Sequence, residues 1–189
     1  MGKIIVIQYV TLDGVVEDPD GRSGTDRGGW AFRFGREQLA GDKFALGPIL
    51  QTGALLFGRR TWEHFSRLWP QRTDPVSTAM NTMPKHVLTR TDPDLTVWAN
   101  SHRLTDAPVE GARRLADAQD VVVIGSLGVV RALAAAGAVD EYRLLTVPTF
   151  LGVGERLFVD QVDLEPVSAV SEGPLVLSTY RPCAATTPG

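Results

Sequence analysis

The 189-residue sequence contains a single cysteine, Cys183, which excludes an internal disulfide and is typical of proteins from reducing compartments. No apolar run approaches the roughly 20 residues that a membrane-spanning helix needs. The first residues carry one lysine and a short β-branched run, without the small-residue cleavage site of a signal peptide. We therefore expect a cytoplasmic protein with no membrane partner.

An excess of basic residues is also missing. Nineteen lysines and arginines oppose 22 acidic residues, so the formal net charge is −3 at pH 7. Without a basic stripe that could follow a phosphate backbone, we expect no nucleic-acid partner. The three histidines share no spacing typical of a metal site, and we expect no metal.

Short β-branched runs alternate with helical patterns, which predicts an α/β fold with a mostly parallel central sheet and helices on both faces. The turn at 172–174 predicts an antiparallel C-terminal hairpin. We expect a single domain over residues 1–189, with an ordered core at about 3–181, because no linker or repeat interrupts the pattern. Strands are expected at 3–10, 54–57, 86–89, 96–98, 121–124, 141–147, 165–172 and 174–181. Helices are expected within 36–51, 60–65, 108–118 and 127–136, a turn-rich stretch at 70–81, and a mobile, glycine-rich loop at 17–29.

The first candidate site is the junction at residues 58–61, where Gly58 ends a buried strand and a helix begins. A glycine there lets a ligand approach the backbone, and the helix start offers free N–H groups. Arg59 and Arg60 carry guanidinium groups suited to phosphate oxygens, and Thr61 adds a hydroxyl. The alternative is a capped helix with two solvated arginines.

The second candidate is the junction at residues 125–129, which again leaves a buried strand and opens a helix. Gly125, Ser126 and Gly128 are small, and backbone donors there suit a pyrophosphate. The six-residue dinucleotide fingerprint is not complete, because Arg131 stands where its last glycine would be. An ordinary helix start is the alternative.

Taken together, the motifs resemble those of the dihydrofolate reductase superfamily. Residues 57–63 (FGRRTWE) resemble its cofactor motif, and the strand ends at 88–90 (LTR) and 124–126 (IGS) follow in the same order. The wider pattern is similar to a bacterial branch related to the C-terminal reductase domain of riboflavin-biosynthesis deaminase–reductases. Its marks are TLDG at 11–14, MNTMPK at 80–85, DEYRL at 140–144 and LGVGERLF at 151–158.

This resemblance implies a three-layer, dihydrofolate-reductase-like fold and an NADPH-dependent reductase. Arg59, with Thr89 and Arg90, would bind the 2′-phosphate of NADPH, and Arg60, Thr61 and the backbone groups from Ser126 to Val129 would contact the pyrophosphate. A homodimer is also expected, because related proteins often pair through their sheet edges. The cofactor-binding residues expected are Gly58, Arg59, Arg60, Thr61, Thr89, Arg90, Gly125, Ser126, Leu127, Gly128 and Val129.

On the substrate side, counting back from Gly58 places Asp42 where many dihydrofolate reductases carry a buried carboxylate on a helix. A buried carboxylate would have a raised pKa and could relay a proton. The alternative is a solvated aspartate in the first turn of that helix. Trp30, Leu46 and Thr146 are the further substrate-binding candidates, although Trp30 would equally pack the 17–29 loop onto the core.

Two questions remain open at this point. Dihydrofolate reductases join two glycines by a cis peptide at the second junction, whereas this chain has Gly125-Ser126, and a cis bond before serine costs about 2.5–4 kcal/mol. The substrate is either a heterocycle of the 5-amino-6-(5-phosphoribosylamino)uracil type from riboflavin synthesis or a pterin such as dihydrofolate. A non-catalytic NADPH-binding protein of the same fold is the alternative from another class.

Overall fold

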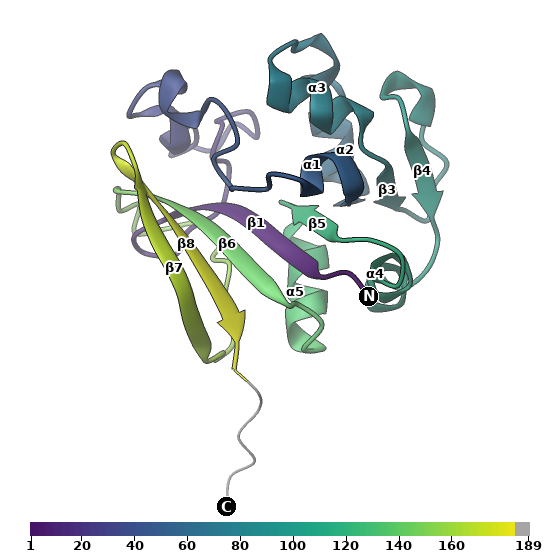
Figure 1. The fold of residues 1–189 in the computed structure, drawn as a ribbon. Helices are drawn as coiled ribbons and strands as arrows, with labels where there is room; N and C mark the ends of the chain where they lie inside the picture. Colours follow the sequence, from purple (N-terminus) through teal and green to yellow (C-terminus); the bar gives the residue numbers. More distant parts are fainter. Residues whose placement is uncertain (184–189) are drawn as a thin grey trace, which may run out of the picture. The chain divides into compact units, whose positions relative to one another are not determined.

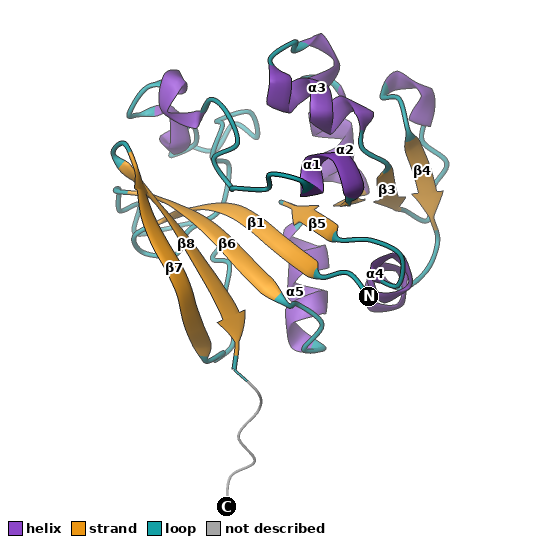
Figure 2. Cartoon of the chain, in the orientation of Figure 1, coloured by secondary structure: helices purple, strands orange, loops and turns teal. Residues whose placement is uncertain are grey.

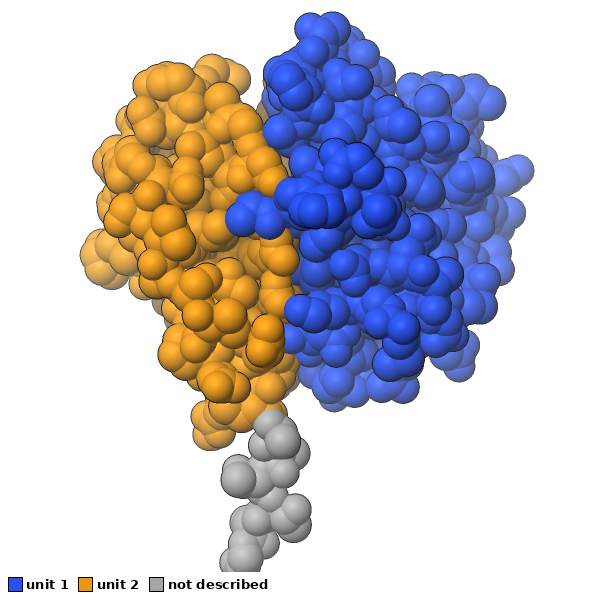
Figure 3. Space-filling model, in the orientation of Figure 1, with its two compact units in different colours: residues 1–6, 45–140 blue, residues 7–44, 141–189 orange. Residues whose placement is uncertain are grey.

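The computed structural model describes residues 1–183, and it divides into two compact units. Unit 1 consists of Met1–Val6 with Ala45–Asp140, and unit 2 of Ile7–Phe44 with Glu141–Gly189, shown in blue and orange in Figure 3. Strand β1 contributes residues to both units. The expectation of a single domain over residues 1–189 stays a prediction.

Eight strands are hydrogen-bonded in the order β4-β3-β2-β5-β1-β6-β8-β7 (Figures 1 and 2). Strand β2 pairs in parallel with β3 and β5, whereas β8 pairs antiparallel with β6 and β7. The predicted mostly parallel sheet with an antiparallel C-terminal hairpin is therefore confirmed. The strands are β1 (Ile4–Thr11), β2 (Ala54–Gly58), β3 (Lys85–Leu88), β4 (Ser101–Leu104), β5 (Val121–Ile124), β6 (Glu141–Val147), β7 (Leu164–Glu172) and β8 (Leu175–Pro182).

The helices of unit 1 pack around its parallel strands, with α2 against β2 and β3, and α4 and α5 against each other. No helix within residues 1–183 is long and apolar enough to cross a membrane. The α-helices are α1 (Ile49–Thr52), α2 (Arg59–Ser66), α3 (Pro75–Thr82), α4 (Pro108–Ala116) and α5 (Leu127–Ala135). Short 3-10 helices span Trp30–Phe32, Arg36–Leu39, Trp69–Gln71 and Leu95–Val97.

Three predicted elements are wrong. The helix expected within 36–51 is only a 3-10 turn and the short α1, because residues 41, 45 and 47 adopt left-handed backbone angles that interrupt a helix. The turn-rich stretch at 70–81 contains α3, which starts where Asp74 accepts a hydrogen bond from Ser77 N. The strand expected at 96–98 is a 3-10 turn, and the strand follows at β4.

Lys85 is the most unusual core residue of unit 1, because its side chain is completely buried. Its Nζ donates to the carbonyl oxygens of Met80, Asn81 and Met83 at 3.1, 2.8 and 2.6 Å. These acceptors surround the end of α3, where carbonyls lack intrahelical partners. Burial lowers the pKa of Lys85 to about 8. Lys85, the lysine of the MNTMPK motif, therefore donates hydrogen bonds to the C-terminal carbonyl groups of α3 from inside the core.

The core of unit 2 forms where the β6–β8 pair meets the segment that follows β1. Trp30 and Ala31 pack there with Leu145, Val147 and Leu177. Strand β7 extends this hairpin, and nearly all its residues are exposed. The hairpin therefore ends in an open strand on its outer side.

Candidate functional site

The predicted cofactor residues of unit 1 lie at the ends of neighbouring parallel strands. Strand β2 lies between β3 and β5, with Gly58 opposite Leu88 and Leu56 opposite Val123. All three strands run in the same direction, so the residues that follow them emerge at one sheet edge. The structure therefore brings the 58–61, 89–90 and 125–129 segments together, as the sequence predicted.

Two hydrogen bonds join the two strand–helix junctions directly. Gly58 N donates to Ser126 Oγ at 2.7 Å, and Ser126 N donates to Thr61 Oγ1 at 3.0 Å. The hydroxyl of Thr61 accepts one bond and keeps its own hydrogen for another acceptor. The start of α2 and the start of α5 are consequently fixed side by side, with their N–H groups at the same edge.

Ser126 makes this link through an uncommon backbone conformation. Both Gly125 (φ 56°) and Ser126 (φ 54°, ψ 57°) are left-handed, and no peptide bond among residues 1–183 is cis. The Gly125–Ser126 bond is therefore trans, which answers the question that the sequence left open. A left-handed serine is uncommon, and here its hydroxyl does not cap α5 but reaches across to Gly58.

The glycines at these junctions differ in the space around them. A Cβ at Gly125 would lie 3.2 Å from Thr61 Cγ2, and its backbone angle would strain any side chain. A Cβ at Gly128 would meet no atom within 4 Å. The first turn of α5 is therefore open at Gly128, whereas Gly125 keeps the chain close to Thr61. An elongated diphosphate fits such a small-residue cradle.

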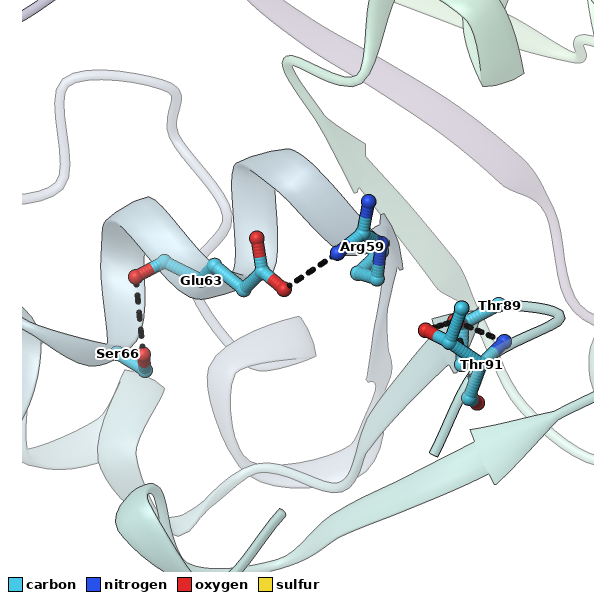
Figure 4. A network of polar contacts seen from close by, with 5 residues as sticks. All are labelled: Arg59, Glu63, Ser66, Thr89 and Thr91. Atoms are coloured by element: carbon cyan, nitrogen blue, oxygen red, sulfur yellow. Dashed lines mark hydrogen bonds and ion pairs between the residues drawn. The ribbon is translucent and has the colours of Figure 1, made fainter. Parts of the chain in front are cut away.

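Figure 4 shows Arg59 and Thr89, two of the predicted phosphate-binding side chains. Arg59 Nη1 lies 3.0 Å from Glu63 Oε1, and both side chains are partly exposed. Thr89 is buried, and its Oγ1 accepts a hydrogen bond from Thr91 N at 3.1 Å, which turns the chain after β3. Arg60 and Arg90 are exposed. The arginines are thus available to a ligand in solution.

The predicted substrate residues do not form one group within a unit. Trp30, Asp42 and Thr146 belong to unit 2, whereas Leu46 belongs to unit 1 and is buried. Thr146 lies half-buried on β6, opposite Val176. Asp42 lies half-buried in the irregular segment before α1, outside any helix. Both alternatives for Asp42, a buried carboxylate on a helix and a solvated residue in the first turn of that helix, are therefore wrong about the helix.

Trp30 is a correction of another kind. Its side chain has no exposed surface, and its Nε1 donates to the Glu17 carbonyl at 2.7 Å. A wall of a substrate pocket needs exposed ring surface, which Trp30 lacks here. The alternative that Trp30 packs its loop onto the core describes this structure.

The 17–29 loop folds around one buried carboxylate. Asp18 is left-handed (φ 47°), and its oxygens accept hydrogen bonds from Ser23 N, Thr25 N and Thr25 Oγ1. Burial raises the pKa of Asp18, but these hydrogen bonds outweigh it and lower that pKa overall. The loop is thus organised locally, and its mobility stays a prediction.

This loop also borders a cavity of about 220 Å³ in unit 2. Arg27 on its wall donates to the Leu151 carbonyl. Ligand pockets for drug-sized molecules commonly measure about 300–1,000 Å³, so the cavity suits only a fragment of a substrate. Its lining residues are Val15, Glu17, Thr25, Asp26, Arg27, Leu151 and Val153.

Asp13 connects the two turns of unit 2 that carry the TLDG and LGVG motifs. Its carboxylate accepts hydrogen bonds from Thr11 Oγ1 at 2.6 Å, Gly152 N at 2.7 Å and Leu151 N at 3.2 Å. The bond from Thr11, followed by that from Gly152, lowers the pKa of Asp13 to about 2. The ionised side chain of Asp13 therefore holds the two motifs together.

The structure adds three contributions that the sequence analysis did not predict. The hydroxyl of Ser126 as a bridge depends on the left-handed backbone, and the Arg59–Glu63 pair was hidden because Glu63 was read only as part of a motif. The i, i+4 spacing of opposite charges was the available signal for that pair. For Lys85, a lysine that opens a buried strand was the signal.

Comparison with known proteins gives a family match over nearly the whole chain. The family model of the RibD C-terminal domain matches residues 2–174. The uncharacterized protein YyaP from Bacillus subtilis (strain 168) is 25% identical over 165 residues, which cover 84% of this chain and 81% of that protein.

Solved structures share the fold. A putative riboflavin biosynthesis protein from Shewanella sp. PV-4 superposes with a TM-score of 0.72 at 18% identity, covering 96% of this chain and 99% of that one. A pyrimidine reductase-like protein from Corynebacterium diphtheriae gives a TM-score of 0.56 at 13% identity, with 97% and 92% covered.

RibD from Acinetobacter baumannii gives a TM-score of 0.63 at 14% identity, and 97% of this chain covers 58% of that longer protein. The fold expected from the resemblance is confirmed by these neighbours. Because the family model spans nearly the whole sequence, this chain belongs to the RibD C-terminal domain family.

Proposed function

We propose that this protein is an NADPH-dependent reductase that transfers a hydride to a small heterocyclic substrate. The observation that carries the proposal is the pair of hydrogen bonds by which Ser126 joins Gly58 to Thr61. They hold two helix N-termini together at one sheet edge, an arrangement suited to a diphosphate. Membership of the RibD C-terminal domain family supports the same assignment. When bound, NADPH supplies the hydride.

The chain's own residues bind and orient the cofactor. Arg60, the Thr61 hydroxyl and the backbone N–H groups at the start of α5 bind the diphosphate. Arg59, Thr89 and Arg90 bind the 2′-phosphate. Arginine favours this role because its planar group can make two parallel hydrogen bonds to a phosphate.

The substrate class follows from the neighbours and from the polar residues of unit 2. A ribosylated pyrimidine of riboflavin synthesis fits the descriptions of a neighbour as a riboflavin biosynthesis protein and of another as pyrimidine reductase-like. A pterin such as dihydrofolate is the second substrate class, and Asp42 would then supply the proton that a reduced C=N nitrogen needs.

Purified protein provides the test. NADPH binding is followed by nicotinamide fluorescence, and NADPH oxidation is then measured with a panel of ribosylaminopyrimidines and dihydropterins. The proposal predicts binding together with oxidation by at least one panel member. Binding with no turnover on the entire panel would favour the non-catalytic NADPH-binding alternative, and absence of binding would contradict both.

A second copy of the chain is the partner that we expect. Strand β7 is an open edge, and Val167 and Val170 on it are 45% and 50% exposed. Exposed apolar strand edges promote pairing. Analytical ultracentrifugation should therefore give a dimer mass, and Val170→Lys should shift the protein to monomer; a monomeric wild type would contradict this expectation.

A further inference from the structure

The start of α2 pairs its first residue with an acid one helical turn later. Arg59 Nη1 lies 3.0 Å from Glu63 Oε1, and the two side chains are 43% and 35% exposed (Figure 4). Ser66 Oγ contacts only the backbone oxygen of Glu63, at 3.0 Å. The guanidinium assigned to the 2′-phosphate therefore already has an anion beside it.

The geometry of the guanidinium leaves room for a second anion. It carries five N–H donors, and Glu63 uses the Nη1 side. A phosphate can therefore bind the remaining donors without displacing Glu63. Both anions would then lie within hydrogen-bond distance of the same group. A like charge about 4 Å away weakens binding by about fivefold in water, and a doubly charged phosphate feels more than a single charge.

For NADH the effect of Glu63 has the opposite sign. NADH presents a ribose 2′-hydroxyl in place of the phosphate, and a hydroxyl donates to a carboxylate. Dinucleotide folds use such an acid to bind this hydroxyl and use arginine for the 2′-phosphate. In this chain the acid and the arginine stand together on one helix face, four residues apart.

We propose that Glu63 sets the cofactor specificity of the site: it weakens the preference for NADPH that Arg59 creates, so that the protein also accepts NADH. This inference rests on the proposed function, because it assumes that a nicotinamide dinucleotide binds at this edge. The Arg59–Glu63 pair contributes little to stability, because exposed i, i+4 ion pairs change helix stability only slightly. Stability alone therefore does not account for the effect on specificity that we propose.

Glu63→Gln tests the inference, because it removes the charge and keeps the shape. NADPH and NADH are titrated separately by nicotinamide fluorescence, and the ratio of their affinities is compared with wild type. The ratio should rise by about fivefold in favour of NADPH. Glu110→Gln, an exposed acid in the first turn of α4, makes the same change of net charge elsewhere in unit 1 and should leave the ratio unchanged.

The ratio of NADPH affinity to NADH affinity separates a change in specificity from a general loss of stability. A variant that is merely destabilised loses affinity for both cofactors alike, and Glu63→Ala should move the ratio in the same direction as Glu63→Gln. A ratio that rises less than about threefold, or that rises equally in Glu110→Gln, overturns the role of Glu63 while leaving NADPH binding intact. A wild type that binds neither cofactor overturns the proposed function, and this inference with it.

Discussion

The two units differ in where they leave apolar surface. Of the eleven large apolar side chains that are exposed among residues 1–183, unit 1 holds two, Met1 and Val97, and unit 2 holds nine. Isolated exposed apolar side chains are ordinary, so the difference lies in their number in each unit. The nine are Leu12, Phe34, Phe150, Val153, Val159, Val162, Val167, Val170 and Val176.

The units also differ in how they hold their polar groups. In unit 1 the polar contacts of the candidate site join the ends of regular strands and helices, as with Ser126 and Thr61. In unit 2 irregular turns gather around single carboxylates, Asp13 and Asp18. Under the proposed function, the regular elements of unit 1 bind the nucleotide, and the loops of unit 2 bind the substrate. We therefore expect changes in unit 1 to affect cofactor binding and changes in unit 2 to affect turnover.

The largest effect is expected from Gly125→Val. Its Cβ would lie 3.2 Å from Thr61 Cγ2, and a β-branched residue is strained at φ 56°. NADPH affinity should fall by more than about 100-fold while the domain remains folded, because rearranging the junction removes several backbone contacts at once. Fluorescence titration and circular dichroism measure the two properties. Gly137→Val, beyond the other end of α5, is the control, since Gly137 is also left-handed (φ 58°) but a Cβ there meets no atom within 4 Å; equal losses in both variants would contradict the cradle.

Asp42→Asn tests whether unit 2 contributes to chemistry. If Asp42 relays the proton, turnover should fall by roughly 10²–10⁴-fold, the usual range for a general acid or base, and NADPH affinity should not change. Steady-state kinetics with the active panel substrate gives the result. Unchanged turnover would exclude the pterin-type mechanism and leave the ribosylated pyrimidine as the substrate class.

Arg59→Ala should weaken NADPH binding by about 1.5–3 kcal/mol, roughly 10- to 150-fold, and barely change NADH binding. Only NADPH offers the 2′-phosphate that this side chain would bind. Calorimetric titration with both cofactors is the measurement, and Arg113→Ala on α4, also exposed, is the matched control. Equal losses for NADPH and NADH would show that Arg59 does not bind that phosphate.

A smaller effect is expected from acid on Asp13. Its pKa is lowered in the folded protein, so the ionised form stabilises the fold above the ordinary pKa of 3.8 and this stability is lost as the pH falls toward about 2. Thermal melting should therefore show a wild-type decline in that window that is shallower in Asp13→Asn. Asp160→Asn, at an exposed position, serves as the charge-matched control. If the melting temperatures of wild type and Asp13→Asn decline in parallel, the hydrogen-bonded Asp13 carboxylate is not the cause.

Sequence patterns predicted the apolar strands of both units better than the irregular segment between β1 and α1, for a physical reason. Strands β2 and β5 are continuous apolar runs, and their glycine endings fix where the helices begin. The segment between β1 and α1 depends instead on left-handed residues, on a long-range hydrogen bond from Leu151 to Asp13 and on local hydrogen bonds to Asp18. Such contacts leave no periodic trace in the sequence.

Two misses in unit 1 had different causes. Helix α3 was hidden in a polar stretch, although Asp74 before Pro75 is a recognisable helix start. Strand β4 is polar and partly exposed at the sheet edge, so no apolar run marks it. The cofactor residues were predicted because their motif is local, whereas the placement of Trp30 required the core that distant strands build.

Hydrogen exchange of the intact protein with and without NADPH tests the central claim most directly. The account predicts slower exchange on binding at the three strand ends of unit 1, namely residues 58–61, 89–90 and 125–129, because a bound diphosphate and 2′-phosphate accept hydrogen bonds from these segments. Peptides from β7 and β8 provide the internal control and should not change. Saturating NADPH that leaves these three segments unprotected, or that protects only segments of unit 2, would contradict the account.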